Sequence, residues 1–193
     1  IRKENLRDVL QYIGFHQQQS LISETWIINY PFGDITVDFT AERIKYPSGL
    51  IAHRETTKNF SSPENFVILE CITRLFSLGY KPNQIELEEP MPGGHADTGG
   101  YCDIIVKDNN RNEFALIECK TADDGSSREF SRAWHRMQED GGQLFNYFNS
   151  FRKAKALCLY ASDWQSGKCV YQSLIVLMED NEEFLRADNK LKG

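Results

Sequence analysis

Two carboxylates and a lysine stand close together in the middle of the chain, within residues 101–120, YCDIIVKDNNRNEFALIECK. Asp103 precedes a β-branched run, and Glu118 and Lys120 follow an apolar run, with a polar turn rich in Asp and Asn between the two runs. This pattern predicts a β-hairpin. Because side chains alternate along a strand, Glu118 and Lys120 fall on one face and Cys119 on the other. If Asp103 lies opposite them, two carboxylates and an ammonium group converge.

This set of side chains suits Mg²⁺ chemistry on a phosphate ester. Mg²⁺ takes one or two carboxylates and fills its other positions with water and substrate phosphate, and Mn²⁺ is its usual substitute. Asp103 and Glu118 would bind the ion, and the Lys120 ammonium would orient the attacking water or stabilise the charge that develops on phosphorus. An exposed Asp, Glu and Lys on a solvated sheet is the alternative. The apolar run that leads directly into Glu118 is more typical of a central strand that ends at a site.

A third acidic group is expected from the helix that precedes this hairpin. Ser62 and Pro63 predict a helix that begins here and runs to residue 78. Glu64 is either a further acid near the metal or a first-turn charge that interacts with the positive end of the helix dipole. Glu70 is a weaker candidate, which we expect to be a partly exposed helix residue.

The loop at residues 90–100 is rich in glycine, and glycine allows a backbone to lie close to phosphate. Its residues His95 and Asp97 are candidates for the site. A solvated histidine at a hairpin tip is the simpler interpretation.

A long helix is expected to begin near residue 127 and to break or kink at the two glycines of residues 141–142. Arg132 and Arg136 recur on it at helical spacing, which favours a basic stripe against a phosphate backbone. Pairing with Glu129 and Glu139 on a solvated helix face explains the same residues nearly as well.

The next turn contains Gln143 and Tyr147, which share one helix face at positions i and i+4. Behind an E-x-K strand, this Q-x-x-x-Y pattern, together with Asp103 and the Glu118-Cys119-Lys120 triplet, resembles the PD-(D/E)xK nuclease superfamily. Cys102 stands where that superfamily usually has a proline. The resemblance implies that the backbone carbonyl of Cys119 is a further metal ligand, and that Gln143 and Tyr147 orient DNA or Lys120.

The resemblance is strongest to the amino-terminal nuclease domain of type I restriction enzyme R subunits, and it spans roughly residues 61–160. It is carried by the segments PENFVILECITRLFSLGY, IELEEPMPGG, GGYCDIIV, ALIECKTA and GGQLFNYF. It implies a Mg²⁺-dependent DNA endonuclease of a restriction-modification system, with DNA, methyltransferase and specificity subunits as partners. Similar domains also begin longer restriction proteins that continue into an adenine DNA methyltransferase.

A catalytically silent module of the same fold, which binds DNA or docks onto subunits, is the alternative function. The net charge of −6 favours it, because phosphate neutralisation is the main source of sequence-independent affinity for DNA. The intact set of Asp103, Glu118 and Lys120 weighs against it, because a docking module needs none of the three.

The length of 193 residues, 40% of them hydrophobic, predicts one compact α/β (α+β) domain. Residues 1–60 are expected to form an N-terminal helix and a small β meander without a catalytic constellation. Residues 61–193 are expected to form the nuclease core, ending in a C-terminal helix or linker. The implied architecture is a restriction-endonuclease-like mixed central sheet with helices on both faces, in the order helix, strand, catalytic hairpin, helix, strand.

The remaining composition points to a reduced cytoplasmic protein. The five cysteines are odd in number and form no C-x-x-C pair, so we expect buried thiols and neither disulfides nor a zinc knuckle. No apolar run is long enough to predict a membrane span. The chain begins with Ile1 and ends with a glycine, from which we expect a fragment of a longer polypeptide.

Overall fold

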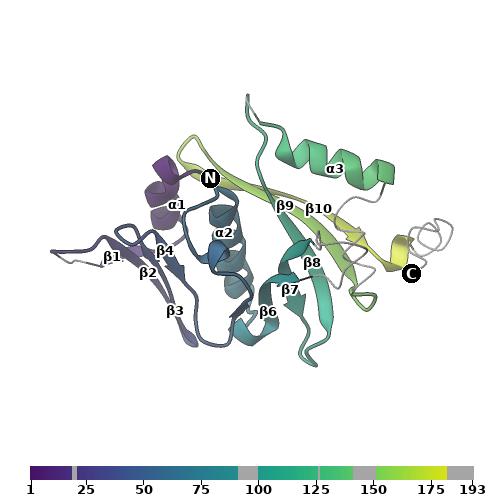
Figure 1. The fold of residues 1–193 in the computed structure, drawn as a ribbon, viewed down its shortest axis with the longest axis horizontal. Helices are drawn as coiled ribbons and strands as arrows, with labels where there is room; N and C mark the ends of the chain where they lie inside the picture. Colours follow the sequence, from purple (N-terminus) through teal and green to yellow (C-terminus); the bar gives the residue numbers. More distant parts are fainter. Residues whose placement is uncertain (19–20, 91–99, 126, 141–150, 182–193) are drawn as a thin grey trace.

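The computed structural model describes residues 1–18, 21–90, 100–125, 127–140 and 151–181, and these form a mixed α+β structure with two sheets (Figure 1). The smaller sheet is antiparallel, in the order β1-β2-β3-β4. Its strands are β1 (His16–Gln18), β2 (Thr25–Tyr30), β3 (Gly33–Asp38) and β4 (Arg43–Lys45). The last three strands confirm the predicted meander, and β1 adds a short strand that its polar sequence does not predict.

The larger sheet has six strands in the order β10-β9-β8-β7-β6-β5. They are β5 (Ile51–Ala52), β6 (Ile85–Pro90), β7 (Tyr101–Lys107), β8 (Glu113–Thr121), β9 (Ala156–Gln165) and β10 (Lys168–Leu177). The predicted hairpin is β7 and β8, which pair antiparallel, whereas β8 and β9 pair in parallel. The prediction of a mixed sheet with the E-x-K strand near its centre is therefore confirmed at this level.

Three α-helices lie in the described residues: α1 (Leu6–Tyr12), α2 (Glu64–Ser77) and α3 (Glu129–Asp140). Short 3₁₀ turns are at Lys3–Asn5, Glu55–Lys58, Pro82–Gln84 and Glu179–Asn181. The start of α2 follows the prediction, because the backbone N–H of Glu64 donates to Ser62 Oγ at 3.3 Å. Gly79, with φ +97°, adopts the left-handed conformation that commonly ends a helix.

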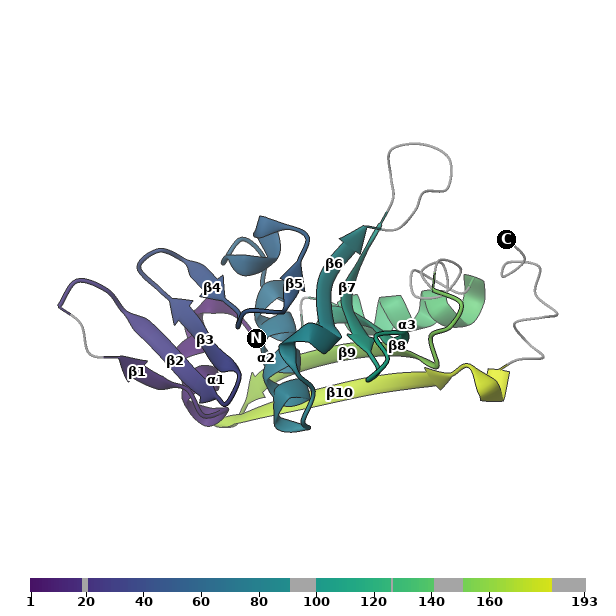
Figure 2. The same cartoon turned by 90° about the horizontal axis from the view of Figure 1, so that it is seen from below.

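Helix α2 lies between the two sheets and is buried on almost every side (Figures 1 and 2). Its apolar side chains join one core with Val37 of the small sheet and with Ile104 and Ile117 of the large sheet. The N-terminal helix and meander thus share a core with the strands beyond residue 60.

Glu70 of α2 is a correction to the sequence interpretation. We expect it to be partly exposed, but its exposed fraction is only 2%. Its charge is accommodated because Arg74 Nη2 and the Tyr160 hydroxyl donate to its two carboxylate oxygens, at 2.6 and 2.5 Å. Burial of a charge requires such compensation, and the partner Tyr160 lies on β9, far from Glu70 in sequence.

Helix α3 covers the opposite face of the large sheet (Figure 1). Strand alternation establishes this arrangement: Ile117 and Cys119 of β8 belong to the core with α2, whereas Leu116 belongs to a second core with Phe130 and Met137 of α3. The prediction of helices on both faces is confirmed. No helix in the described part of the chain is long and apolar enough to cross a membrane. The predicted C-terminal helix or linker, residues 182–193, lies outside the described residues.

Three of the five cysteines are buried, as expected: Cys71, Cys102 and Cys119. Cys158 and Cys169 are half-buried, and all five are free thiols. Burial raises the pKa of Cys119 well above its ordinary value, so this thiol is neutral although it lies between two charged residues.

Candidate active site

The hairpin brings Asp103 and Glu118 together. Ile104 and Ile117 are direct partners across β7 and β8, and Asp103 and Glu118 are the residues next to them on the two strands. Asp103 is further fixed because the backbone N–H of Cys119 donates to its Oδ2 at 2.7 Å. The convergence expected from the sequence is therefore present.

Lys120 connects this pair of strands to helix α2. Its Nζ donates to Glu118 Oε1 at 2.6 Å and to Glu64 Oε1 at 2.9 Å. Glu64 is the first residue of α2, and the helix start places it at the carboxyl end of β8. The sequence leaves Glu64 as either a third acidic group near the metal or a first-turn charge on the helix. Its contact with Lys120 supports the third acidic group.

The buried carboxyl groups of Asp103 and Glu118, together with Glu64, surround the Lys120 ammonium. Burial raises the pKa of Asp103 well above its ordinary value, the Glu118 carboxylate raises it further, and Lys120 opposes the rise. Burial likewise raises the pKa of Glu118 to about 7, despite the hydrogen bond from Lys120. Burial lowers the pKa of Lys120, but the carboxylates of Glu118, Asp103 and Glu64 outweigh this effect and raise it. Lys120 is therefore a cation at neutral pH.

The donor set fits a hard divalent cation. Glu118 Oε2 is buried and has no hydrogen-bond partner among the described residues, which is costly for a carboxylate oxygen. An oxygen ligand in need of a positive charge, beside the buried Asp103 carboxylate, is what a Mg²⁺ or Mn²⁺ ion would satisfy. Asp103 and Glu118 would hold the ion. Cys119, whose backbone carbonyl is the further ligand that the resemblance implies, lies between Glu118 and Lys120 on β8.

Glu88 is an acidic residue of this region that the sequence interpretation missed. It lies on β6, next to β7, its side chain is largely buried, and Arg54 pairs with it at 3.1 Å. Its charge also contributes to the raised pKa of Glu118. The sequence signal for Glu88 is the recurrence of glutamate in the strand segment IELEEP, because glutamate is depleted in β-strands.

Helix α3 forms a wall beside the carboxylates. A pocket of about 180 Å³ is lined by Glu118 and Lys120 of the sheet and by Glu129, Arg132 and Arg136 of α3, among others. The two arginines predicted as a basic stripe thus face the same space as the E-x-K residues. Arg132 is also 3.7 Å from Glu129, so the predicted pairing along the helix face is present as well.

Two pairs of candidate residues lie outside the described residues: Gln143 with Tyr147, and His95 with Asp97. Cys102, at the position of the family's proline, is fully buried and packs in the core on the α3 side of the sheet. The neighbouring Asp103 carboxylate keeps its place without a proline before it.

Neither a protein-family model nor a curated protein matches this chain. A function is therefore argued from the geometry of the site, with the resemblance of its short motifs as support.

Proposed function

We propose that this chain is a Mg²⁺-dependent endodeoxyribonuclease, the nuclease module of a restriction system. The observation that carries the proposal is the buried Oε2 of Glu118, which has no hydrogen-bond partner in the part of the chain that the structure describes. It lies beside the Asp103 carboxylate and on the same strand face as Lys120. The order of α2, β6, the hairpin, α3 and β9 supports a restriction-endonuclease-like fold, because it repeats the order that the resemblance implies.

Each residue has a distinct role in this proposal. A bound Mg²⁺ would supply Lewis-acid stabilisation of the scissile phosphate and lower the pKa of the attacking water. Asp103 and Glu118 hold the ion, and the rigid strands keep their carboxylates in place. The Lys120 ammonium orients the water and stabilises the developing charge on phosphorus. Glu64 holds Lys120 in position through their 2.9 Å contact.

DNA would approach from the side of α3. Arg132 and Arg136 line the pocket that contains Glu118 and Lys120, where they could contact a phosphodiester backbone that reaches these residues. The net charge of −6 opposes tight binding of DNA by this chain alone. We therefore expect recognition and much of the affinity to come from partner domains or from methyltransferase and specificity subunits.

The first test compares the wild-type protein with Asp103→Asn in two assays. Calorimetric titration with Mn²⁺ measures metal binding, and nicking of supercoiled plasmid in Mg²⁺ measures hydrolysis. We expect Asp103→Asn to lose nicking by more than about 1,000-fold, since several kcal/mol of metal-derived stabilisation disappear and each 1.36 kcal/mol is a factor of ten. Asp8→Asn, on the exposed face of α1, is the matched control. Equal nicking by wild type and Asp103→Asn contradicts the proposal.

A specific observation favours the silent module as the second candidate. The Lys120 ammonium already bridges Glu118 and Glu64, so part of the site's negative charge is satisfied without a metal. In a silent module, Mn²⁺ would bind no more tightly to the wild-type protein than to Asp103→Asn. Carboxylate-dependent Mn²⁺ binding without nicking would instead mean a real site that requires the rest of its system.

A further inference from the structure

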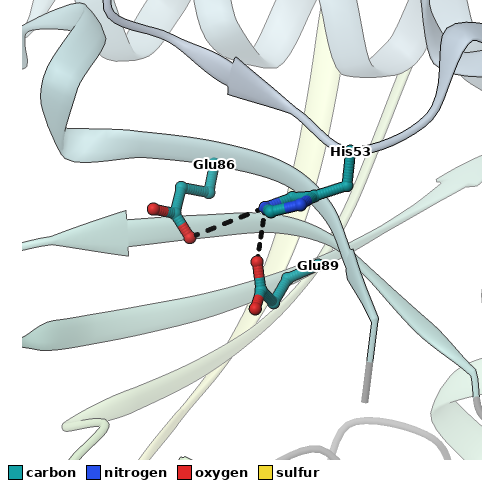
Figure 3. Close-up of side chains that lie close together, drawn as sticks. All are labelled: His53, Glu86 and Glu89. Carbon is teal, nitrogen blue, oxygen red and sulfur yellow. Dashed lines mark ion pairs between the residues drawn. The ribbon is translucent and has the colours of Figure 1, made fainter.

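Three side chains that could ligate a metal meet at the β5 edge of the large sheet. His53 follows the short strand β5, and Glu86 and Glu89 lie on β6 (Figure 3). His53 Nε2 is 2.5 Å from Glu89 Oε2 and 3.9 Å from Glu86 Oε2. Among the described residues, this is the one group of three potential ligands from His, Cys, Asp and Glu whose donor atoms all lie within 4.8 Å of one another.

The local backbone builds this group. The N–H of His53 donates to the carbonyl of Leu87 at 3.0 Å, which fixes the histidine beside β6. Glu88 has φ +51°, a left-handed conformation that is uncommon for a residue other than glycine. Because regular alternation along β6 is interrupted there, Glu86 and Glu89 reach the same imidazole although they are three positions apart.

The charges of the group are only partly balanced. Lys107 Nζ binds Glu86 Oε1 at 2.6 Å and leaves Oε2 directed at His53 (Figure 3). Burial raises the pKa of Glu89, and although His53 opposes this, the adjacent Glu86 carboxylate raises it further. The exposed fractions of the His53, Glu86 and Glu89 side chains are 31%, 15% and 26%, so an ion from solvent can reach all three.

We propose that His53, Glu86 and Glu89 form a second metal site, which takes a divalent transition metal of the zinc class and leaves one position open to water. One imidazole nitrogen and two carboxylate oxygens are ligands that Zn²⁺ accepts, whereas Mg²⁺ prefers oxygen alone. Bond lengths of about 2.1 Å place tetrahedral donors about 3.4 Å apart. The two distances from His53 Nε2 to the carboxylates, 2.5 and 3.9 Å, lie on either side of this value, so side-chain shifts of less than about 1 Å bring each carboxylate to that distance from the imidazole.

The metal would strengthen the attachment of the edge strand β5 to β6. Strand β5 has two residues and pairs with β6 at only two positions, so its attachment is weak. A shared ion would join the residue after β5 to two residues of β6. The site uses none of the residues assigned to hydrolysis, so it goes beyond the proposed nuclease function and does not depend on it.

The test is calorimetric titration with Zn²⁺, in the Asp103→Asn background to remove competition from the hydrolytic carboxylates. We expect one equivalent of Zn²⁺ to bind, and His53→Gln and Glu89→Gln each to weaken binding by more than about 100-fold, beyond the 10- to 100-fold typical of outer partners. The matched control is His135→Gln, because His135 is exposed on α3, where it pairs with the exposed Glu139 at 3.1 Å, and this variant should bind Zn²⁺ as before.

Circular dichroism would test whether each variant is folded. Because two ligand variants are tested independently, the proposal can still be judged if one of them fails to fold. The visible spectrum of bound Co²⁺ gives a second readout, because it should change on His53→Gln and not on His135→Gln. The absence of stoichiometric Zn²⁺ binding, or equal affinity in folded His53→Gln and Glu89→Gln proteins, overturns the proposal. Failure of the nicking assay would have no bearing on it, so the two proposals fail separately.

Discussion

Replacement of Glu118 by glutamine should make the metal-free protein more stable at high pH. Burial raises the pKa of Glu118 from 4.5 to about 7 in the folded protein, whereas the unfolded chain has the ordinary value. Between these values the folded protein binds more protons than the unfolded chain. Its free energy of unfolding therefore falls as the pH rises from about 4.5 to about 7, and the loss is complete above that range.

The magnitude follows from the two pKa values. Between pH 5 and pH 8, ionisation of Glu118 should cost the wild-type protein roughly 2–3 kcal/mol of its free energy of unfolding. Glu118→Gln keeps the shape of the side chain and an oxygen that can accept from Lys120, but it does not titrate. The difference in stability between variant and wild type should thus move by roughly 2–3 kcal/mol in favour of the variant across this range.

Urea denaturation in EDTA at pH 5, 6, 7 and 8 measures this difference, and the double comparison cancels the titrating groups that do not interact with Glu118. Glu4→Gln, which removes an exposed carboxylate from the first 3₁₀ turn, is the control for the loss of a carboxylate outside the site. A Glu118→Gln difference that is flat with pH would refute the view that this carboxylate is buried and uncompensated in the absence of metal.

Three further changes test other parts of the structure. Lys120→Met should lower the nicking rate by about 100- to 1,000-fold while calorimetry still detects Mn²⁺ binding, because an electrostatic contact is lost and the carboxylates remain. Arg136→Gln in the Asp103→Asn background should weaken DNA binding and reduce the slope of log K against log salt by about 0.9, whereas Lys168→Gln at the distant β9–β10 turn should not. Glu70→Gln should lower the free energy of unfolding by about 2 kcal/mol in urea denaturation, because Arg74 and Tyr160 lose a charged acceptor.

The sequence predicts the elements whose pattern is local. The hairpin of β7 and β8 is visible from two apolar runs around a polar turn, and α2 from Ser62, Pro63 and a helical spacing that ends at Gly79. The structure pairs β8 with β9 in parallel, which the helix between the two strands allows. Asp103, Glu118 and Lys120 are found because hairpin register converts sequence spacing directly into proximity.

The sequence does not predict features that depend on contacts between distant segments. The burial of Glu70 depends on Tyr160, which is 90 positions away. Glu88 approaches Glu118 only because β6 pairs with β7, and its φ of +51° has no signature in the residue type. His53 meets β6 through the two-residue strand β5, which is too short to give a periodic signal.

The side chains of β8 alternate between the candidate site and the core that contains α2. Glu118 and Lys120 face α3, while Ile117 and Cys119 between and beside them pack against α2. A slip of β8 by one residue would place both charges in the α2 core and turn the apolar pair toward α3. The burial of Ile117 and Cys119 therefore sets the register that carries the two charged groups, and Cys119 serves by its small apolar side chain rather than by thiol chemistry. The same packing that stabilises the sheet holds the carboxylates in an arrangement that burial makes unfavourable, and a bound cation would remove that cost.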